Sequence, residues 1–190
     1  IIRYMRFRLG DENNLKGSDA LDINYDTNIV IDHCSISWGI DEVFSTYCNK
    51  NVTVQYCIVG EGLNYAGHSM GGLWGAYSTY HHNLIHTNGS RHPKYASIAT
   101  NELADSRNNV IYNWNYQSAY TGEQGNLNLI NNYYKPGPAT QPNVLKRILQ
   151  ADEDVILYAE GNYVAGSPEV TINNWNGGID SMENQKMPIR

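Results

Sequence analysis

A short apolar–polar pattern that ends in Asn or Cys recurs along the chain and most constrains its fold. Copies occupy residues 28–34, 51–57, 77–83, 109–115 and 126–132, a sixth is expected at 156–162, and residues 2–5 resemble the tail of an earlier one. Their last residues are 17 to 32 positions apart, with a mean near 26. Such steps are typical of one solenoid coil made of three short strands.

The last residue of each copy has a physical role in such a coil. A turn residue that stacks coil upon coil must accept a bent or left-handed backbone and must satisfy its own polar groups. Asn does both, because it tolerates positive φ and its amide can bond the neighbouring coil. We therefore predict a ladder of turn residues made of Cys34, Cys57, Asn83, Asn115, Asn132 and Asn162.

The residues before each turn alternate as a strand with one inward face does. Val52, Val54 and Tyr56 give this period of two. The composition agrees, since 15 Tyr and 17 Gly favour strands separated by turns. We predict an all-β chain that forms a right-handed parallel β-helix. A β-sandwich with Asn at its turns by chance is the alternative.

Length and charge limit the classes of protein and partner. The 190 residues suffice for one domain with a core, so we expect a single parallel β-helix domain over residues 1–190. The chain begins within a strand pattern and stops without a natural end, and we expect it to be truncated at both ends. A net charge of -6 argues against nucleic acid, although local basic residues or a cation could still hold an acidic polymer.

Cysteine content and hydropathy add two expectations. Three cysteines are too few for a disulfide scaffold and favour buried packing. No apolar stretch approaches the roughly 18 residues of a membrane span, and we do not expect these residues to include a signal peptide. We expect no membrane partner.

Three segments together resemble polysaccharide lyase family 1, the pectate and pectin lyases. They are Gly17–Ile23 followed by Ile29–Glu42, then Thr79–His86 with its Thr-Tyr-His-His-Asn run, and Ser90–Pro93 with its Arg-x-Pro. The offsets agree with the family as well: Asp19 precedes Asp32 by 13 residues, and Arg91 follows Asn83 by 8. The resemblance covers residues 1 to about 165. It implies a fragment of the catalytic domain of a calcium-dependent lyase.

The resemblance places Asp19, Asp41 and Glu42 at a calcium site. Removing the weakly acidic proton on carbon 5 of a uronate is easier when the adjacent carboxylate is neutralised, and Ca²⁺ held by oxygen ligands can do this. Asp19 and Asp41 are 22 residues apart, about one coil, so they could face one ion. The family carries a further carboxylate where this chain has Ser45. Solvated loop carboxylates are the alternative interpretation of Asp41 and Glu42.

The resemblance implies that Arg91 is the catalytic base. Arginine is intrinsically a weak base, so this role requires a desolvated site beside a cation, where positive charge opposes protonation. Two alternatives remain open for Arg91. It could clamp a substrate carboxylate through its two-pronged guanidinium, or it could form a structural salt bridge.

Two family positions for basic residues are altered here. Met70 stands where many members carry a substrate-binding lysine, and Ala96 where a second basic residue is expected. Lys94 and His68 are close enough in sequence to substitute, and we predict that they bind substrate. Trp74, near Gly71 and Gly72, is predicted to offer a surface on which sugar rings stack.

Two histidine motifs have structural explanations. Asp32-His33 could be a catalytic dyad, but an Asp at a strand end commonly caps turn amides, and we favour structure. His81 and His82 are adjacent on a strand, so we expect them to point to opposite faces and not to share a metal ion.

Three functions from different classes remain open. The favoured one is a calcium-dependent lyase that cleaves pectate or a related acidic polyuronate of the plant cell wall by β-elimination. A β-helix glycoside hydrolase needs paired carboxylates about 5 to 9.5 Å apart, which no strand motif here indicates. A polysaccharide-binding or weakened β-helix protein is the third. From the resemblance we also expect a secreted monomer, extracellular or periplasmic.

Overall fold

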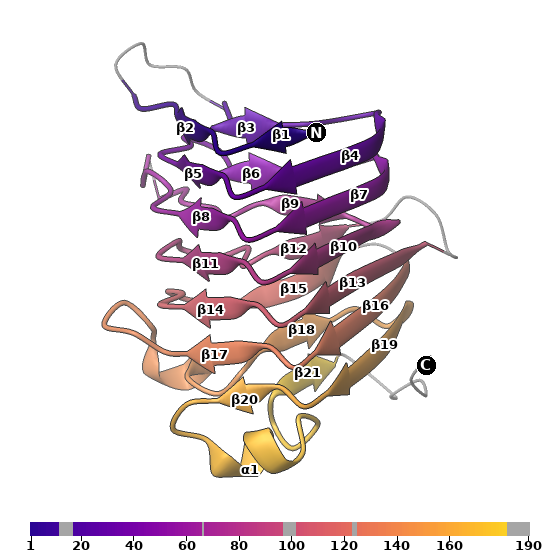
Figure 1. The fold of residues 1–190 in the computed structure, drawn as a ribbon. Coiled ribbons are helices and arrows are strands. Elements are labelled where there is room, and N and C mark those ends of the chain that lie inside the picture. The colour runs from indigo at the N-terminus through magenta and orange to yellow at the C-terminus, as the bar shows by residue number, and fades with distance from the viewer. Residues whose placement is uncertain (12–16, 66, 97–101, 123–124, 182–190) are drawn as a thin grey trace.

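The chain winds into a parallel β-helix whose coils each contribute a strand to three faces (Figure 1). The computed structural model describes residues 1–11, 17–65, 67–96, 102–122 and 125–181. Every strand pair in its named sheets is parallel. The predicted fold class is confirmed.

Two seven-stranded sheets form the first two faces. The first contains β1 (Ile2–Arg3), β4 (Thr27–Asp32), β7 (Lys50–Gln55), β10 (Ser78–His81), β13 (Leu103–Arg107), β16 (Gly125–Ile130) and β19 (Val155–Glu160). The second contains β2 (Arg6–Arg8), β5 (Ser35–Ser37), β8 (Ile58–Gly60), β11 (Leu84–His86), β14 (Val110–Tyr112), β17 (Tyr133–Lys135) and β20 (Tyr163–Val164).

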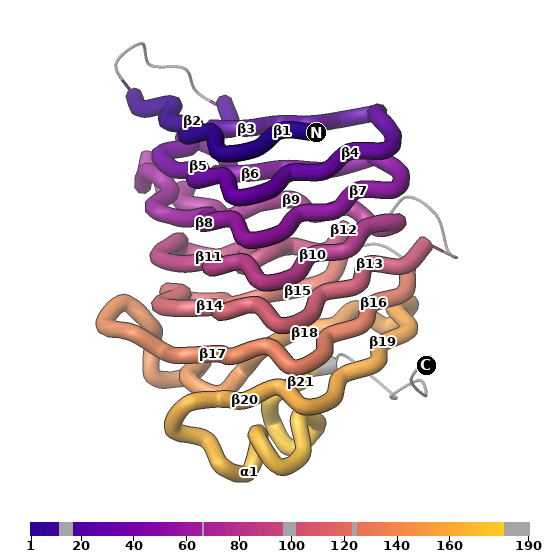
Figure 2. Tube along the Cα trace, viewed as in Figure 1, coloured from indigo at the N-terminus to yellow at the C-terminus, as the bar shows by residue number. Residues whose placement is uncertain are grey.

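The third face carries the functional candidates. Its strands are β3 (Leu21–Asp22), β6 (Phe44–Ser45), β9 (Leu73–Gly75), β12 (Lys94–Ala96), β15 (Ala119–Gly122), β18 (Leu149–Ala151) and β21 (Ile179–Ser181). A parallel bridge between Thr46 and Trp74 joins the pair β3–β6 to the other five. A short 3₁₀ helix, η1 (Pro142–Val144), precedes β18, and α1 (Pro168–Ile172) lies below the last coils in the tube view (Figure 2).

Inward side chains stack from coil to coil to build the core. In the first sheet Ile31 pairs with Val54, Val54 with Tyr80, and the same column continues to Leu129. All four side chains are fully buried. Burying one large apolar side chain contributes about 1.5–3 kcal/mol, so these columns hold the coils in register.

A hydrogen-bonded ladder crosses the turns between the first and second sheets. Each backbone N–H donates to the side chain of the ladder residue one coil further on, Oδ1 of Asn or Sγ of Cys. The six ladder residues in order are Cys34, Cys57, Asn83, Asn109, Asn132 and Asn162, and the N–H of the last donates to Oδ1 of Asn174, which follows α1. All seven are buried, which satisfies polar groups that would otherwise be costly to bury.

One position of the predicted ladder was wrong, because Asn109 and not Asn115 belongs to it. Asn109 Nδ2 donates to the carbonyl of Tyr80 at 2.9 Å and to Oδ1 of Asn132 at 3.0 Å. The apolar residues Val110–Tyr112 form a strand of the second sheet, so the apparent copy at 109–115 was shifted by one strand. Asn115 lies in the following turn.

The left-handed backbone also lies at a different residue than predicted. It belongs to the residue before each ladder position, at His33 (φ 52°), Tyr56 (51°), His82 (56°), Asn108 (54°), Asn131 (53°) and Gly161 (70°). This turn directs the side chain outward. His33, Tyr56 and His82 therefore form an exposed stack, with 5.0 Å between neighbouring ring centroids. The ladder residue itself is free to point inward.

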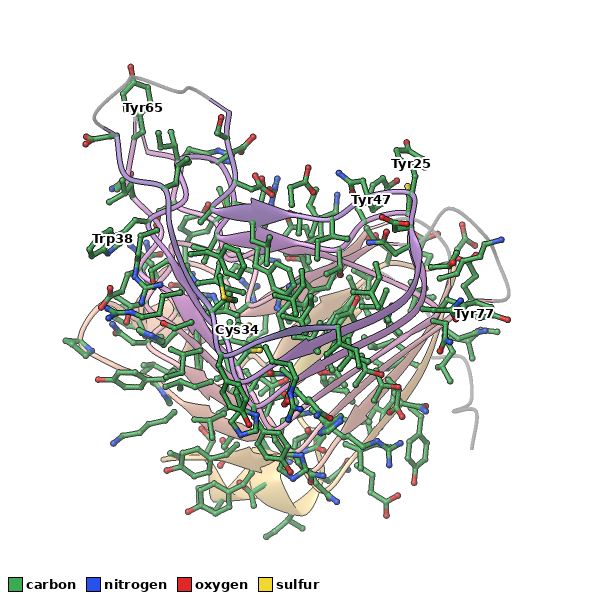
Figure 3. The ribbon with its side chains drawn as sticks, turned by 45° about the horizontal axis from the view of Figure 1, so that its top comes forward. Tyr25, Cys34, Trp38, Tyr47, Tyr65 and Tyr77 are labelled. Atoms are coloured by element: carbon green, nitrogen blue, oxygen red, sulfur yellow. The ribbon has the colours of Figure 1, made fainter. Side chains whose placement is uncertain are left out.

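The cysteines are unpaired, as the sequence favoured. Cys34 and Cys57 are buried and Cys48 is half-buried. Figure 3 shows Cys34 inside the coil, whereas Trp38 and Tyr65 lie at one outer edge and Tyr25, Tyr47 and Tyr77 toward the other. Over the described residues, no helix is long and apolar enough to cross a membrane.

Candidate active site

The candidate catalytic residues gather where the strands of the third sheet begin. Asp19 precedes β3, Glu42 precedes β6, Met70 precedes β9 and Arg91 precedes β12. Parallel bridges join Glu42 to Met70 and Met70 to Ser90. Equivalent residues of successive coils therefore stack, and segments far apart in the sequence form one surface.

Arg91 is held from two sides. Its guanidinium forms an ion pair with the carboxylate of Glu42 through Nη1, and its Nε donates to the hydroxyl oxygen of Tyr120 at 2.9 Å. Glu42 is almost fully buried, and Arg91 is about one-fifth exposed. The guanidinium thus has a fixed position but still reaches solvent.

The backbone of Arg91 is fixed as well. It adopts φ 59°, and its carbonyl accepts a hydrogen bond from the N–H of Gly72 at 3.0 Å. A Cβ at Gly71 would lie 2.1 Å from the same carbonyl oxygen. Position 71 therefore requires glycine, since only glycine leaves room for the Arg91 turn.

Acidic side chains crowd beside Arg91. Asp41 Oδ1 lies 2.5 Å from Nε2 of His68, and ligand atoms of Asp41, Glu42 and His68 lie within 4.8 Å of one another. Asp19 Oδ1 accepts the backbone N–H of Glu42 at 3.1 Å. The structure thus places Asp19, Asp41 and Glu42 near one another, and it adds to them His68, which the sequence analysis assigned to substrate.

Electrostatics make this cluster receptive to a cation. Burial raises the pKa of Asp19 to about 6; a hydrogen bond from Ser45 opposes the shift, and the charges of Asp22 and Asp41 add to it. Ser45 thus stands beside Asp19 where the family has a carboxylate. Carboxylate oxygens are what Ca²⁺ prefers, so Asp19, Asp41 and Glu42 fit the ion, with His68 as a hydrogen-bonding neighbour rather than a hard-cation ligand.

Lys94 and Tyr120 lie next to Arg91 on the outer surface of the third sheet. Their Cα atoms are partners in the register of β12 and β15, and the Lys94 ammonium lies 5.8 Å from the Tyr120 ring centroid. Lys94 therefore supplies a positive charge on the same face. Sequence reasoning missed Tyr120, which only the coil register connects to Arg91.

The prediction for Trp74 needs correction. The residue is 1% exposed, its ring stacks on Tyr80 at 4.4 Å between centroids, and its Nε1 donates to the carbonyl of Phe44 at 3.1 Å. A ring enclosed in this way has no free face for a sugar. Trp74 is a core residue because it lies at an inward position of β9.

Asp32 serves the structure of the first sheet. Burial opposes its ionisation, but hydrogen bonds from Gln55, His33 and Arg3 lower the pKa of Asp32 below its ordinary value. It lies on β4, on a different face from Arg91. The structural interpretation of Asp32-His33 fits these contacts.

The expectation that His81 and His82 point to opposite faces was wrong. Their Nδ1 atoms lie 2.8 Å apart. His81 ends β10, and the left-handed turn at His82 swings its ring to the same side. Among the described residues, the only group of three or more side chains placed to hold a metal ion is Asp41, Glu42 and His68.

Comparison with known proteins gives the chain its relatives. No family model matches it. It is 38% identical to probable pectate lyase C of Aspergillus flavus over 189 residues, which are 95% of this chain and 42% of that protein. The probable pectate lyase C of Emericella nidulans is 34% identical over 193 residues, 100% of this chain and 43% of that protein.

The chain spans less than half the length of these relatives. The match nevertheless covers nearly all of the chain, and that with the Emericella nidulans protein includes Asp19, Glu42 and Arg91. Together with the parallel β-helix, this similarity over nearly the whole chain supports membership of the pectate lyase family.

Proposed function

We propose that this chain carries the active site of a calcium-dependent pectate lyase, which cleaves an acidic polyuronate of the plant cell wall by β-elimination. The placement of Arg91 is the observation that supports this most. Its guanidinium is fixed between Glu42 and Tyr120, reaches solvent, and lies beside a crowded carboxylate cluster. Its relatives carry the name pectate lyase.

The proposed reaction begins with proton transfer from carbon 5 of the uronate to Arg91. The electron pair left behind forms the double bond between carbons 4 and 5, and the bond from carbon 4 to the glycosidic oxygen breaks. That oxygen leaves with a proton supplied by water. The products are a chain with an unsaturated end and a chain with a new hydroxyl group.

Each side chain has a separate task in this proposal. Asp19, Asp41 and Glu42 would hold Ca²⁺, which would supply positive charge to neutralise the substrate carboxylate next to carbon 5. Lys94 would attract the carboxylate of a neighbouring sugar. Tyr120 would keep the Arg91 guanidinium aimed at the bound substrate.

Glu42 couples the two halves of the site. It is the ion-pair partner of Arg91, and its carboxylate also belongs to the cluster that would hold the cation. A bound cation would therefore draw on the same carboxylate that positions the Arg91 guanidinium.

The polysaccharide partner and a secreted, monomeric state are parts of the same proposal. The acidic chain carries its basic residues Arg91 and Lys94 on one face, which suits a polyanion better than the net charge of -6 suggests. No interaction with nucleic acid or membrane is proposed.

The test uses the full natural protein and polygalacturonate. Unsaturated product is followed by its ultraviolet absorbance, and reducing ends are counted in parallel, with Ca²⁺ or with chelator. We expect unsaturated ends that equal the reducing ends in number and vanish with chelator. Reducing ends without unsaturation would indicate a hydrolase, and binding without either product would indicate a binding protein. Either result would reject the lyase.

A further inference from the structure

A pocket of about 230 Å³, lined mainly by polar residues, opens beside the candidate active site, outside the residues assigned above. Loops from four successive coils line it: those between β8 and β9, between β11 and β12, and between β14 and β15, with Ala139 from the loop between β17 and β18. Its polar lining consists of Asn64, Ser69, Thr87, Asn88, Asn113, Asn115 and Tyr116. Among the described residues that line it, none carries a charge.

The floor of this pocket is held rigid by hydrogen bonds. Asn88 Oδ1 accepts the N–H of Gly62 at 2.9 Å, and Asn113 Oδ1 accepts the N–H of Ala139 at 2.8 Å. Ser69 Oγ donates to the carbonyl of Gly62 at 2.8 Å. These hydrogen bonds fix the positions of the loops relative to one another, so the pocket is preformed.

The rim retains groups that a ligand could use. Asn115 Oδ1 accepts from Gln141 at 3.0 Å, while its Nδ2 makes no hydrogen bond to any described residue. Asn64 and Thr87 are exposed, and the Tyr116 ring is 38% exposed. Amide, hydroxyl and aromatic groups of this kind suit a ring with an apolar face and hydroxyl edges.

Tyr116 connects the pocket to the candidate active site. Its hydroxyl donates to the Met70 sulfur at 3.7 Å, and Met70 is bridged to both Glu42 and Ser90. On the pocket side its ring lies close to Gly89, where an added Cβ would come within 3.3 Å of Cε1. The pocket is therefore separated from the Arg91 site by little more than one aromatic residue.

The uncharged lining of the pocket disfavours an ionised ligand. A carboxylate moved into this pocket would lose hydration without meeting a cation, which is unfavourable. A neutral, hydroxyl-bearing ring would meet both donors and acceptors. The volume is below the roughly 300–1,000 Å³ of sites for drug-sized ligands, so it suits a single ring.

We propose that this pocket is a subsite for an uncharged sugar unit of the polysaccharide that is cleaved at Arg91. The unit is either a uronate whose carboxylate is methyl-esterified or a neutral sugar, since both offer hydroxyl groups without charge. This inference rests on the proposed function and adds a substrate preference to it. The protein then selects partly neutral polymers over fully ionised ones.

The test measures binding by calorimetry in chelator, so that no turnover interferes. The full natural protein is titrated with three oligosaccharides of equal length: a fully ionised oligogalacturonate, its methyl-esterified form and a neutral oligogalactan. We expect the wild type to bind at least one uncharged oligomer about tenfold more tightly than the ionised one. Tighter binding of the methyl-esterified oligomer would identify the unit as an esterified uronate, and tighter binding of the oligogalactan would identify it as a neutral sugar.

Two variants locate the preference. Tyr116→Ala should remove it, and Asn115→Lys should invert it, because a lysine ammonium would pair with a carboxylate at the pocket rim. Asn128→Lys, on the distant first sheet, should leave it unchanged. If Tyr116→Ala folds poorly, Asn115→Lys still decides the test.

The outcomes separate this inference from the proposed function. Equal affinities, no binding of any oligomer, or a preference that survives Asn115→Lys would each overturn the subsite, even in an active lyase. A preference that the two pocket variants alter, in a protein without lyase activity, would support the subsite and reject the proposed function.

Discussion

The guanidinium of Arg91 forms an ion pair with the nearly buried carboxylate of Glu42, across the coil that carries Met70. This pair joins the candidate base to the candidate cation site. Its two partners come from different sequence segments, and only the stacking of coils brings them together.

Glu42→Gln should weaken both stability and cation binding. The substitution leaves the Arg91 charge without its partner, and we expect the free energy of unfolding to fall by about 1–3 kcal/mol. Calcium affinity, measured by calorimetry, should fall at least tenfold. Glu169→Gln, at an exposed 3.8 Å pair with Lys146, is the control and should change neither quantity appreciably. Unchanged calcium affinity in Glu42→Gln would remove Glu42 from the cation site.

Buried His92 should make the fold sensitive to acid. Burial, with a smaller effect from His86, lowers the pKa of His92 from 6.5 to about 3, against a hydrogen bond to the Gln117 backbone. The unfolded chain therefore binds more protons below pH 6.5. The stability that the neutral side chain provides is complete above that pH and is lost as the pH falls toward 3.

Urea unfolding between pH 7 and pH 4 tests this dependence. Over the pH range in which His92 is protonated only in the unfolded chain, the free energy of unfolding should fall by up to about 1.4 kcal/mol for each unit by which the pH is lowered. His92→Gln should give a visibly flatter pH profile than the wild type. Parallel profiles for the two proteins would show that His92 is not buried in its neutral form.

Asn109 should matter more to stability than Asn115. Asn109 is buried and bonded to the coils on both sides, so replacing it by Ala should cost about 2–4 kcal/mol. Asn115→Ala should cost less than about 1 kcal/mol, because Asn115 lies outside the ladder. Chemical denaturation of the two variants measures both values. A larger loss of stability in Asn115→Ala than in Asn109→Ala would show that Asn115 belongs to the ladder.

These two residues also show how far sequence reasoning reaches for the fold. The alternation before Cys34, Cys57 and Asn83 has a period of two and identifies strands without any structure. At 109–115 a similar pattern spans the ladder residue of a turn, the strand β14 and the beginning of the next turn. Periodicity alone cannot tell which polar residue turns inward, because the left-handed turn that decides it lies one residue earlier.

For the site, sequence spacing succeeded where residues precede equivalent strands. Asp19, Asp41, Glu42 and Arg91 came together because parallel coils stack their strand starts. The prediction for Trp74 was wrong because inward and outward positions alternate along β9, and the neighbouring glycines do not reveal whether Trp74 points inward or outward. Tyr120 was missed because its link to Arg91 depends on the register of two coils.

Tyr120→Phe should lower turnover without unfolding the protein. The hydroxyl that receives the Arg91 Nε–H is lost, while the ring beneath Lys94 remains. A hydrogen bond to a charged group contributes about 1.5–3 kcal/mol, so kcat should fall about 10- to 100-fold with a smaller change in KM. Tyr133→Phe, on the second sheet, serves as the control. A change in KM alone would assign Tyr120 to substrate binding and not to positioning Arg91.

The most direct test of the proposed lyase compares Arg91→Ala with Arg107→Ala in the full natural protein. Arg107 is a half-buried arginine of β13 that pairs with Asp105, and it lies on the first sheet, a different face from the cluster. The rate of unsaturated product from polygalacturonate is measured with Ca²⁺ present. The account predicts a loss of at least about 100-fold for Arg91→Ala and a near wild-type rate for Arg107→Ala. Equal rates for wild type and Arg91→Ala would contradict it.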